Sequence, residues 1–224
     1  MKLSKNTHAV LSNFASINNG LLVKPGSLIG TISPNKTILA FATAETFDQE
    51  FCIYDLSQFL GTLSLFDDPE LTFHEKTVVI VEGAAAINYT YADPNTIVTV
   101  PDKKLTCDPD VSFEVSADIL SQVFRGASVL ALPNVIFEPN GGGGVAVSAI
   151  DVKDSSSNRL CVDIPAEDCT VVPDHEFKMV FKVENLKLMA GTYNVMISQK
   201  GIGHFSTEGL EYFIAVDQAD SSFK

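Results

Sequence analysis

Long apolar segments are absent from this chain of 224 residues. No run approaches the ~20 consecutive apolar residues that a helix needs to cross a bilayer. The first residues, MKLSKNTHAVLSNF, include no continuous apolar region and no small-residue cleavage site, so we do not expect a signal peptide. With 46% hydrophobic residues and a mean hydropathy of +0.18, the chain can still form a core. These features argue against a membrane protein.

Cysteine is scarce and lacks the spacing of a redox or metal motif. The four cysteines are Cys52, Cys107, Cys161 and Cys169, and none forms a Cys-x-x-Cys pair. Scattered cysteines of this kind are typical of buried, reduced thiols in a cytosolic protein. We therefore expect no disulfide and no zinc site built on cysteine.

Motifs for nucleotide binding and for nucleophilic catalysis are also missing. The four glycines at 141–144 are not followed by Lys-Ser or Lys-Thr, so they indicate a hairpin turn rather than a phosphate loop. Histidines 74 and 175 each precede a glutamate, but no second histidine follows at the spacing of a zinc helix. No Gly-x-Ser-x-Gly nucleophile elbow is present. The sequence predicts a protein without catalytic residues, metal or other cofactor.

Three aspartates, Asp151, Asp154 and Asp163, could form a carboxylate cluster. The segment Asp-Ser-Ser-Ser-Asn at 154–158 is more simply interpreted as the tip of a hairpin. An enzyme with a dispersed site remains an alternative hypothesis, and it would depend on residues such as Asp163 and His175.

Positive charge is in short supply and unevenly placed. The chain has 15 Lys and Arg against 28 Asp and Glu, which gives a net charge of −13 and would normally argue against nucleic acid. The first acidic residue, however, is Glu45, and residues 1–44 carry four lysines. The other 180 residues therefore carry −17. A second segment without acidic residues, 119–137, contains Arg125.

One unit of sequence occurs twice. Residues 51–65, FCIYDLSQFLGTLSL, align without a gap with residues 181–195, FKVENLKLMAGTYNV. Both copies predict a strand, a short helix, a Gly-Thr turn and a second strand. A chain that repeats one unit after about 130 residues is typical of two similar domains in tandem. The Pro- and Asp-rich segment 92–111, with one possible extended strand at 97–100, is the expected linker.

The periodicity predicts helices packed on one face of antiparallel sheet in each half, an α+β arrangement. We expect domains 1–107 and 112–224, with Asn19-Gly20 as a left-handed cap after the first helix. The expected helices cover 4–17, about 54–60, 117–126 after an N-cap at Ser116, and about 184–190. The expected strands cover 21–24, 28–32, 37–43, 71–73, 77–82, 86–91, 128–132, 134–138, 145–151, 159–164, 168–172, 193–199, 202–206 and 211–216, before a polar tail at 217–224.

Lysine and arginine recur on the polar faces of these helices or at their ends. Lys and Arg among small polar neighbours can contact phosphates without reading bases. This combination suits a protein that holds DNA without stopping at one sequence. The residues concerned are Lys2, Lys5, Arg125, Lys182 and Lys187.

Several segments, in order along nearly the whole chain, resemble the sliding clamps of T4-like bacteriophages. They are MKLSKNTHAVLSNFASINNG, IYDLSQFLGTLSL, ADPNTIVTVP, ADILSQVFR, NLKLMAGTYNVMIS and EYFIAVDQADSSF. The resemblance implies the processivity-clamp fold, with two similar domains per chain and three chains in a head-to-tail ring. Twelve helices would line the hole and six curved sheets would form the outer wall.

The resemblance also implies function and partners. The ring would be loaded onto duplex DNA by an ATP-driven clamp loader, would tether the replicative polymerase, and would bind late-transcription factors, all in the cytoplasm of the infected bacterium. The basic residues named above would face DNA. Partner peptides would dock in an apolar pocket between the linker and the last strand, with the walls Val98, Val100, Pro101, Phe213 and Ala215.

Two departures from the family pattern concern the inner charge. Ser12 and Ser128 occupy positions where related clamps are expected to carry further basic residues, which implies a weaker grip on DNA. Residues 66–90 and 132–175 match only in character, so no function is carried over to their loops. The main alternative is an oligomeric structural protein of the virion without a clamp role.

Overall fold

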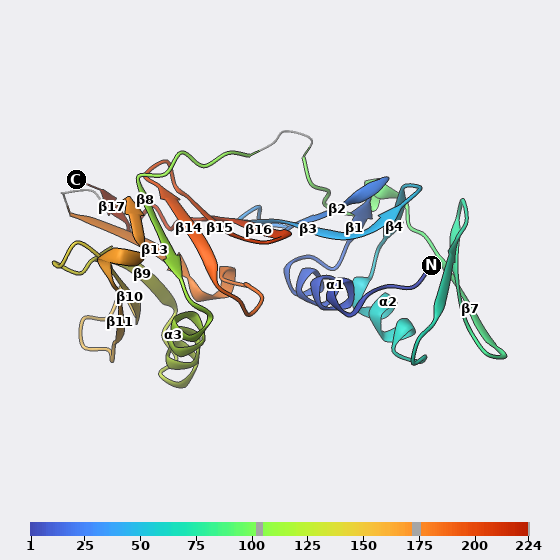
Figure 1. Cartoon of the computed structure of the whole chain (residues 1–224), viewed down its shortest axis with the longest axis horizontal. Coiled ribbons are helices and arrows are strands. Elements are labelled where there is room, and N and C mark those ends of the chain that lie inside the picture. The colour runs from blue at the N-terminus through green and yellow to red at the C-terminus, as the bar shows by residue number, and fades with distance from the viewer. Residues whose placement is uncertain (102–104, 172–175, 224) are drawn as a thin grey trace. The chain divides into compact units, whose positions relative to one another are not determined.

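A computed structural model describes residues 1–101, 105–171 and 176–223. The chain divides into two compact units, Met1–Lys103 (unit 1) and Lys104–Lys224 (unit 2) (Figure 1). No helix in the described part of the chain is long and apolar enough to cross a membrane.

Among its described residues, unit 1 contains two α-helices and three groups of strands. Its helices are α1 (Lys5–Ile17) and α2 (Leu56–Leu63), with the 3-10 helix η1 (Pro94–Thr96). Its strands are β1 (Leu21–Val23), β2 (Gly26–Ile32), β3 (Ile38–Phe47), β4 (Phe51–Ile53), β5 (Glu70–Phe73), β6 (Thr77–Glu82) and β7 (Ala85–Thr90). Strand β1 pairs with β4, β2 forms a hairpin with β3, and β5, β6 and β7 form an antiparallel sheet.

Unit 2 contains one α-helix among its described residues, α3 (Ala117–Val129), and the 3-10 helices η2 (Ala166–Asp168) and η3 (Val183–Asn185). Its strands are β8 (Val111–Val115), β9 (Asn134–Pro139), β10 (Val145–Ile150), β11 (Leu160–Ile164), β12 (Cys169–Val171), β13 (Phe177–Lys182), β14 (Tyr193–Ser198), β15 (Ile202–Thr207), β16 (Leu210–Ala215) and β17 (Ser222–Phe223). They pair antiparallel in the orders β11-β10-β9-β13-β17 and β12-β8-β14-β15-β16.

Helices cover the sheets because each has one apolar face. In unit 1, α1 packs on α2 and on β3, and Phe14 and Leu56 are fully buried. In unit 2, α3 packs on β10 and β11. On the neighbouring strands β9 and β13, the rings of Phe137 and Phe181 pack edge to face at 5.6 Å between centroids. Each such side chain contributes about 1.5–3 kcal/mol through burial.

The hairpin turns expected from the sequence are confirmed. Glycines 141–144 connect β9 to β10, where the Asn140 side-chain oxygen accepts from the amides of Gly142 and Gly144 at 2.9 and 3.0 Å. Residues 154–158 form the tip between β10 and β11, with Asp154 accepting from the Ser156 amide at 2.9 Å.

Several local expectations are wrong. Residues 128–132 are not a strand, because α3 continues to Val129 and Ala131 turns with a positive φ of 52°. The linker forms η1 instead of a strand at 97–100, and its last residue, Val111, begins β8. The left-handed cap expected at Asn19-Gly20 is also wrong, because α1 ends at Ile17 and its C-cap residue, Asn18, is extended. Among the four cysteines only Cys52 is buried, and Cys161 is exposed.

The most consequential correction concerns residues 184–190, which form no fourth helix. Only η3 forms there, and the chain then runs irregularly into β14. The Tyr193 hydroxyl donates to the Met189 carbonyl at 2.8 Å, and the Met189 amide donates to the Tyr212 hydroxyl at 3.3 Å. Because these hydroxyls occupy the Met189 backbone groups, the segment does not need helical hydrogen bonds to satisfy them.

Candidate functional site

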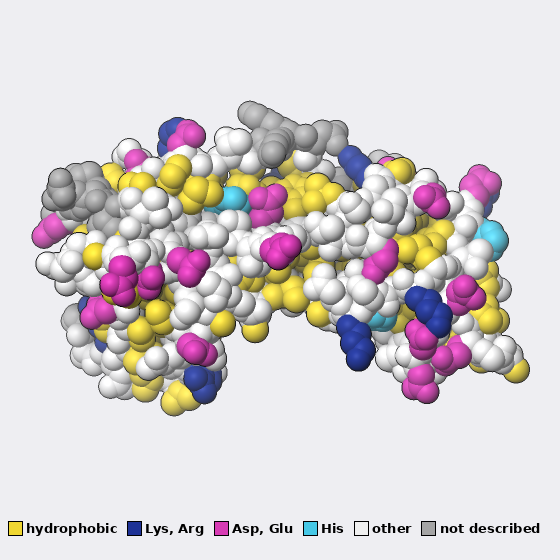
Figure 2. Space-filling view, in the orientation of Figure 1, with side chains coloured by type: hydrophobic (Ala, Val, Ile, Leu, Met, Phe, Trp, Pro, Cys, Tyr) yellow, Lys and Arg dark blue, Asp and Glu magenta, His cyan; other side chains and the backbone are white. Residues whose placement is uncertain are grey.

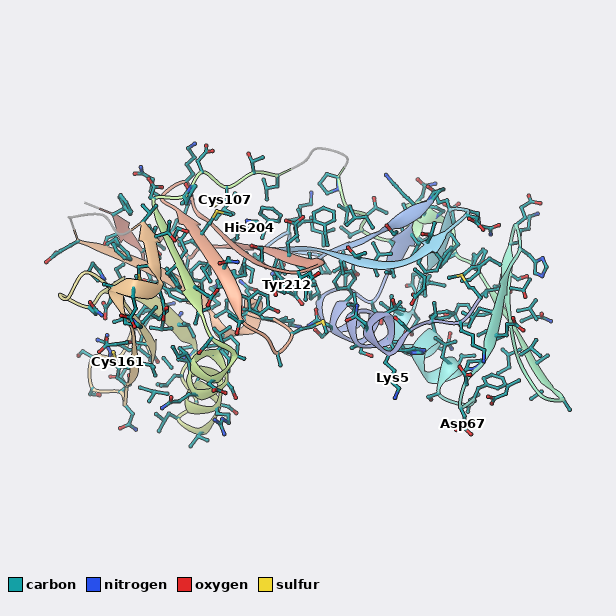
Figure 3. The ribbon with its side chains drawn as sticks, viewed as in Figure 1. Lys5, Asp67, Cys107, Cys161, His204 and Tyr212 are labelled. Atoms are coloured by element: carbon teal, nitrogen blue, oxygen red, sulfur yellow. The ribbon has the colours of Figure 1, made fainter. Side chains whose placement is uncertain are left out.

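Helix α1 presents a polar face that carries Lys5. The Ser4 side chain caps the helix by accepting from the Thr7 amide at 3.1 Å, and Glu45 accepts from the Ser4 amide at 2.7 Å. Thr7, Val10, Leu11, Phe14 and Ile17 are buried, whereas Lys5, Asn6, Ala9, Ser12 and Ser16 are exposed. Figure 3 shows Lys5 projecting away from the ribbon of unit 1. The predicted division of this helix into an apolar and a polar face is confirmed.

Lys2 lies before the helix and is paired with an acid. Its ammonium group donates to the carboxylate of Asp68. This hydrogen bond, together with the nearby charges of Asp68, Glu70 and Glu82, raises the pKa of Lys2. Lys2 remains exposed, but its charge is partly compensated, so it is a weaker candidate for a phosphate contact than Lys5.

Arg125 lies on the exposed face of α3. The Ser116 side chain caps this helix by accepting from the Ile119 amide at 3.3 Å, as the sequence predicts. Leu120, Val123 and Ala127 are buried. Arg125 and Ser128 are exposed, and the Arg125 Nε donates to the Ser121 carbonyl at 3.2 Å. Its neighbours one turn away include the exposed polar residues Ser121 and Ser128 and the exposed apolar residue Val129.

The two remaining candidate lysines do not lie on an α-helix. Lys182 ends β13, where its ammonium is 3.9 Å from the Asp217 carboxylate, and Lys187 lies in the irregular segment after η3. Lys182 also lines a groove of about 560 Å³ that contains four carboxylates. They belong to Asp151, Glu184, Asp217 and Asp220. Acids around Lys182 oppose phosphate binding there.

Charge on the molecular surface is mixed rather than uniformly basic. Figure 2 shows acidic side chains spread over the viewed face and basic ones among them. Lys5 and Arg125 therefore stand out because of their helical position, not because of a large basic patch. Contacts made by such isolated cations are weak and sensitive to salt.

The linker residues predicted to bind partners are accessible. Val98 is 38% exposed, Val100 is half-buried and Pro101 is exposed. The Val98 carbonyl accepts from the Asn18 side chain at 3.1 Å, which ties the linker to the end of α1. These three residues belong to unit 1.

The strand residues predicted to bind partners lie on β16 in unit 2. Phe213 is only 6% exposed because the His204 ring stacks on it at 4.3 Å between centroids. The His204 Nε2 lies 3.0 Å from the Glu211 carboxylate, and Ala215 is half-buried. Figure 3 labels His204 on β15 and, near it, Cys107 in the irregular segment before β8. The structure describes each unit by itself, so a pocket formed by both groups stays a prediction.

The residues named for a dispersed enzyme site find no support in the described part of the chain. His175 lies outside the described residues, and Asp163 is exposed on β11. No group of three or more His, Cys, Asp or Glu side chains among the described residues could hold a metal ion. Burial raises the pKa of the Cys52, Cys107 and Cys169 thiols, which disfavours a reactive thiolate at these positions.

Sequence reasoning missed residues that act through distant contacts. Glu45 holds the start of α1 by accepting a hydrogen bond from the Ser4 amide. Burial acts to raise the pKa of Glu45, but the hydrogen bonds from Thr7 and Ser4 outweigh it and lower that pKa. Its only signal was its position as the first acid after 44 residues. Asn18, His204 and Tyr193 carried no signal that distinguished them from ordinary polar or aromatic residues.

Comparison with known proteins covers both units. Residues 2–99 match the family model described as DNA polymerase processivity factor, and residues 112–218 match the model described as gp45 sliding clamp, C terminal. The chain is 34% identical over 223 residues to the sliding clamp of Vibrio phage KVP40, covering 97% of this chain and 99% of that protein. It is 31% identical to the sliding clamp of Enterobacteria phage T4, with 99% of each chain covered.

Solved structures agree on the fold. A structure of A. fulgidus PCNA bound by the C-terminal region of FEN-1 matches with a TM-score of 0.73 at 14% identity over 96% of this chain and 98% of that one. A Helicobacter pylori beta clamp matches with a TM-score of 0.70 at 13% identity, over all of this chain and 66% of that one. The predicted α+β fold class is confirmed.

Proposed function

This chain belongs to the sliding-clamp family of DNA polymerase processivity factors, and from that premise we propose that it encircles duplex DNA as a homotrimeric ring. The observation that carries the proposal is the match at 34% identity across 97% of this chain and 99% of a phage sliding clamp. A structural protein of the virion is not favoured, because the relatives that match over their whole length are sliding clamps.

The charge distribution supports a ring that slides. Net charge is −13, so most of the surface repels DNA, while Lys5 and Arg125 stand on exposed helix faces. Contacts from a few cations to phosphates are independent of sequence and weak. A closed ring does not need strong contacts, because dissociation requires opening of the ring. Lys2 and Lys187 would add weaker contacts to DNA inside the ring, and the acids around Lys182 would make its contact the weakest.

We propose that the protein acts without catalysis or cofactor and works through its partners. A clamp loader would place the ring on DNA, and the replicative polymerase would be held by it. Late-transcription factors would bind the ring at the surface that the polymerase uses. All of this would take place in the cytoplasm of the infected bacterium. Partner peptides would bind along the linker at Val98, Val100 and Pro101, and along β16 at Phe213 and Ala215.

Two sheet edges suit the closure of such a ring. Strand β7 lies at one edge of the sheet β5-β6-β7 in unit 1, and β11 lies at one edge of its sheet in unit 2. The opposite edge of the unit 1 sheet is occupied at Leu71, which exchanges backbone hydrogen bonds of 2.6 and 2.7 Å with Met1. A ring of identical chains needs two different surfaces that fit one another, and edge strands offer free backbone groups. We propose that β7 of one chain meets β11 of the next.

Native mass across a concentration series tests the ring. We expect a species near three times the chain mass of 24.2 kDa at high concentration, with smaller species on dilution. A monomer at every concentration would contradict spontaneous ring closure.

The helix faces are tested by reversing charge. Lys5→Glu combined with Arg125→Glu should leave the native mass unchanged but shorten loader-dependent DNA synthesis by the polymerase. Each lost phosphate contact should also lower the slope of log affinity against log salt by about 0.9. The matched control is Lys36→Glu with Lys76→Glu, which makes the same charge change at two exposed turn lysines. Equal processivity of the two double variants would contradict the assignment of the inner faces.

A further inference from the structure

The segment Asn18-Asn19-Gly20, directly after α1, does not cap that helix by a left-handed turn. Asn18 is extended, with φ −148° and ψ 131°, and its amide donates to the Phe14 carbonyl at 2.8 Å. Neither Asn19 nor Gly20 has a positive φ. These polar residues therefore have another use, and their contacts show it.

Asn18 bridges two parts of unit 1 that are far apart in sequence. Its side-chain nitrogen donates to the Val98 carbonyl at 3.1 Å, and its side-chain oxygen accepts from the Gly20 amide at 3.0 Å. One amide group thus fixes the turn after α1 and holds the linker to that turn. The bond crosses 80 residues of sequence.

Gly20 makes room for the neighbouring linker residue. A Cβ atom at this position would lie 2.7 Å from the Cγ2 of Ile97 and 2.8 Å from its Cβ. Gly20 itself is buried. The Ile97 side chain therefore packs against the backbone of Gly20, and the carbonyl of the next residue, Val98, accepts a hydrogen bond from Asn18.

Asn19 joins the second helix to the same point. Its carbonyl accepts from the Leu56 amide at 2.7 Å. Its side-chain oxygen accepts from the Ser57 amide at 3.2 Å and from the Ser57 hydroxyl at 3.0 Å. The three residues 18–20 form a junction at which the end of α1, the start of α2 and the linker meet.

We propose that Asn18 and Gly20 are positioning residues for the partner surface of the linker. They fix the backbone at Ile97 and Val98, so that Val98 presents its side chain in a constant place. Binding of a partner peptide then depends on the end of the same helix that carries Lys5. The inference rests on the proposed function, in which Val98 contacts partner peptides.

Asn18→Asp tests the proposal with little change of shape. The aspartate keeps an acceptor for the Gly20 amide but replaces the donor to the Val98 carbonyl with a second acceptor. The probe is a fluorescent synthetic peptide of the C-terminal residues of the cognate replicative polymerase. We expect its dissociation constant to rise about five- to tenfold, with native mass unchanged. Asn6→Asp, on the exposed face of α1, is the control for the added charge.

Hydrogen exchange supplies a second readout that general destabilisation would not mimic. In Asn18→Asp the amides of residues 97–100 should exchange faster, while those of β6 stay at the wild-type rate. Faster exchange in both places would mean that the variant unfolds the unit, and Gly20→Ala would then be measured, with the same expectation for 97–100. Unchanged exchange at 97–100 in both variants would overturn the proposal.

A direct variant separates this inference from the function on which it rests. Val98→Glu should abolish peptide binding if the linker is a partner surface. If Val98→Glu binds the peptide as the wild type does, the proposed partner surface is wrong. If Val98→Glu fails to bind while Asn18→Asp matches the wild type, or if Asn18→Asp and Asn6→Asp weaken binding equally, the positioning role is wrong.

Discussion

In unit 1, residues 56–63 form helix α2, whereas the aligned residues 186–193 of unit 2 run irregularly into strand β14. The helix buries Leu56, Phe59 and Leu63 at the spacing of one helix face. The aligned residues in unit 2 are Leu186, Met189 and Tyr193. The first two are apolar as well, so the apolar pattern alone does not explain the difference.

The third aligned pair, Leu63 and Tyr193, explains why only the segment in unit 1 is helical. Leu63 closes the apolar face of α2, but Tyr193 brings a hydroxyl that donates to the Met189 carbonyl at 2.8 Å. In a helix that carbonyl would accept from the backbone amide of residue 193. A side chain thus replaces a helical bond, and the residue 193 backbone joins the ladder with β8 instead. One buried tyrosine can therefore redirect a segment whose sequence otherwise resembles a helix.

The largest expected contrast is between the aligned residues Phe59 and Met189. Phe59 is 3% exposed and packs edge to face on Tyr89 at 5.1 Å, whereas Met189 is half-buried. Phe59→Ala should lower the free energy of unfolding by about 3–5 kcal/mol, and Met189→Ala by less than half of that. Urea unfolding measures both. Equal losses would mean that the irregular segment is packed as firmly as the helix.

Alkaline pH should act on the tyrosine pair. Burial raises the pKa of Tyr212 to about 12 and that of Tyr193 well above its usual value. Both raised pKa values favour the neutral tyrosine in the folded protein. The contribution of the pair to the free energy of unfolding is therefore fully present below about pH 10, where tyrosine in the unfolded chain is also neutral. It is lost as pH rises toward the folded pKa.

For Tyr212 the expected loss of unfolding free energy between pH 10 and pH 12 is about 2 kcal/mol. Tyr212→Phe should lack this loss, and Tyr54→Phe, which alters a tyrosine that is 63% exposed, should keep it. Denaturant unfolding at each pH gives the comparison. The same dependence on pH in both variants would contradict a buried, neutral pair.

Tyr193→Phe at neutral pH tests the redirecting bond itself. It removes the donor to the Met189 carbonyl, which should lower the free energy of unfolding by about 1–3 kcal/mol if that carbonyl stays buried without a partner. Hydrogen exchange should accelerate in residues 186–192 and remain slow in α2. Wild-type exchange in this segment would show that the tyrosine does not hold it.

The smallest expected effect compares the aligned glycines. Gly61 lies inside α2 with nothing within 4 Å of an added Cβ, so Gly61→Ala should stabilise the protein by about 0.5–1 kcal/mol. Gly191 lies outside any helix, and its added Cβ would make an ordinary 3.7 Å contact with Tyr193. Gly191→Ala should change little. Thermal unfolding measures the stability of both variants. A larger increase in stability for Gly191→Ala than for Gly61→Ala would contradict this comparison.

Periodicity was sufficient to predict much of the fold. The faces of α1 and α3 follow from apolar spacing, and strands such as β6 and β15 follow from alternation between turn residues. Strand β8 was missed because it lies between a segment rich in proline and aspartate and the N-cap Ser116. The 128–132 strand failed because an apolar run of that length fits the end of a helix equally well.

The candidate site was predictable only where it depends on one element. The exposure of Lys5 and Arg125 follows from their helices. The ion pair of Lys2 with Asp68 crosses 66 residues, and the bond from Asn18 to Val98 crosses 80, so no local pattern encodes them. The covering of Phe213 by His204 likewise depends on strand register.

Retention on circular DNA tests the central claim most directly. The protein would be loaded by the cognate clamp loader onto nicked circular DNA and separated by gel filtration in salt high enough to remove weak phosphate contacts. A closed ring predicts that protein co-elutes with the circle and is released when a restriction enzyme linearises it. Release at the same rate from circular and linear DNA would contradict encirclement.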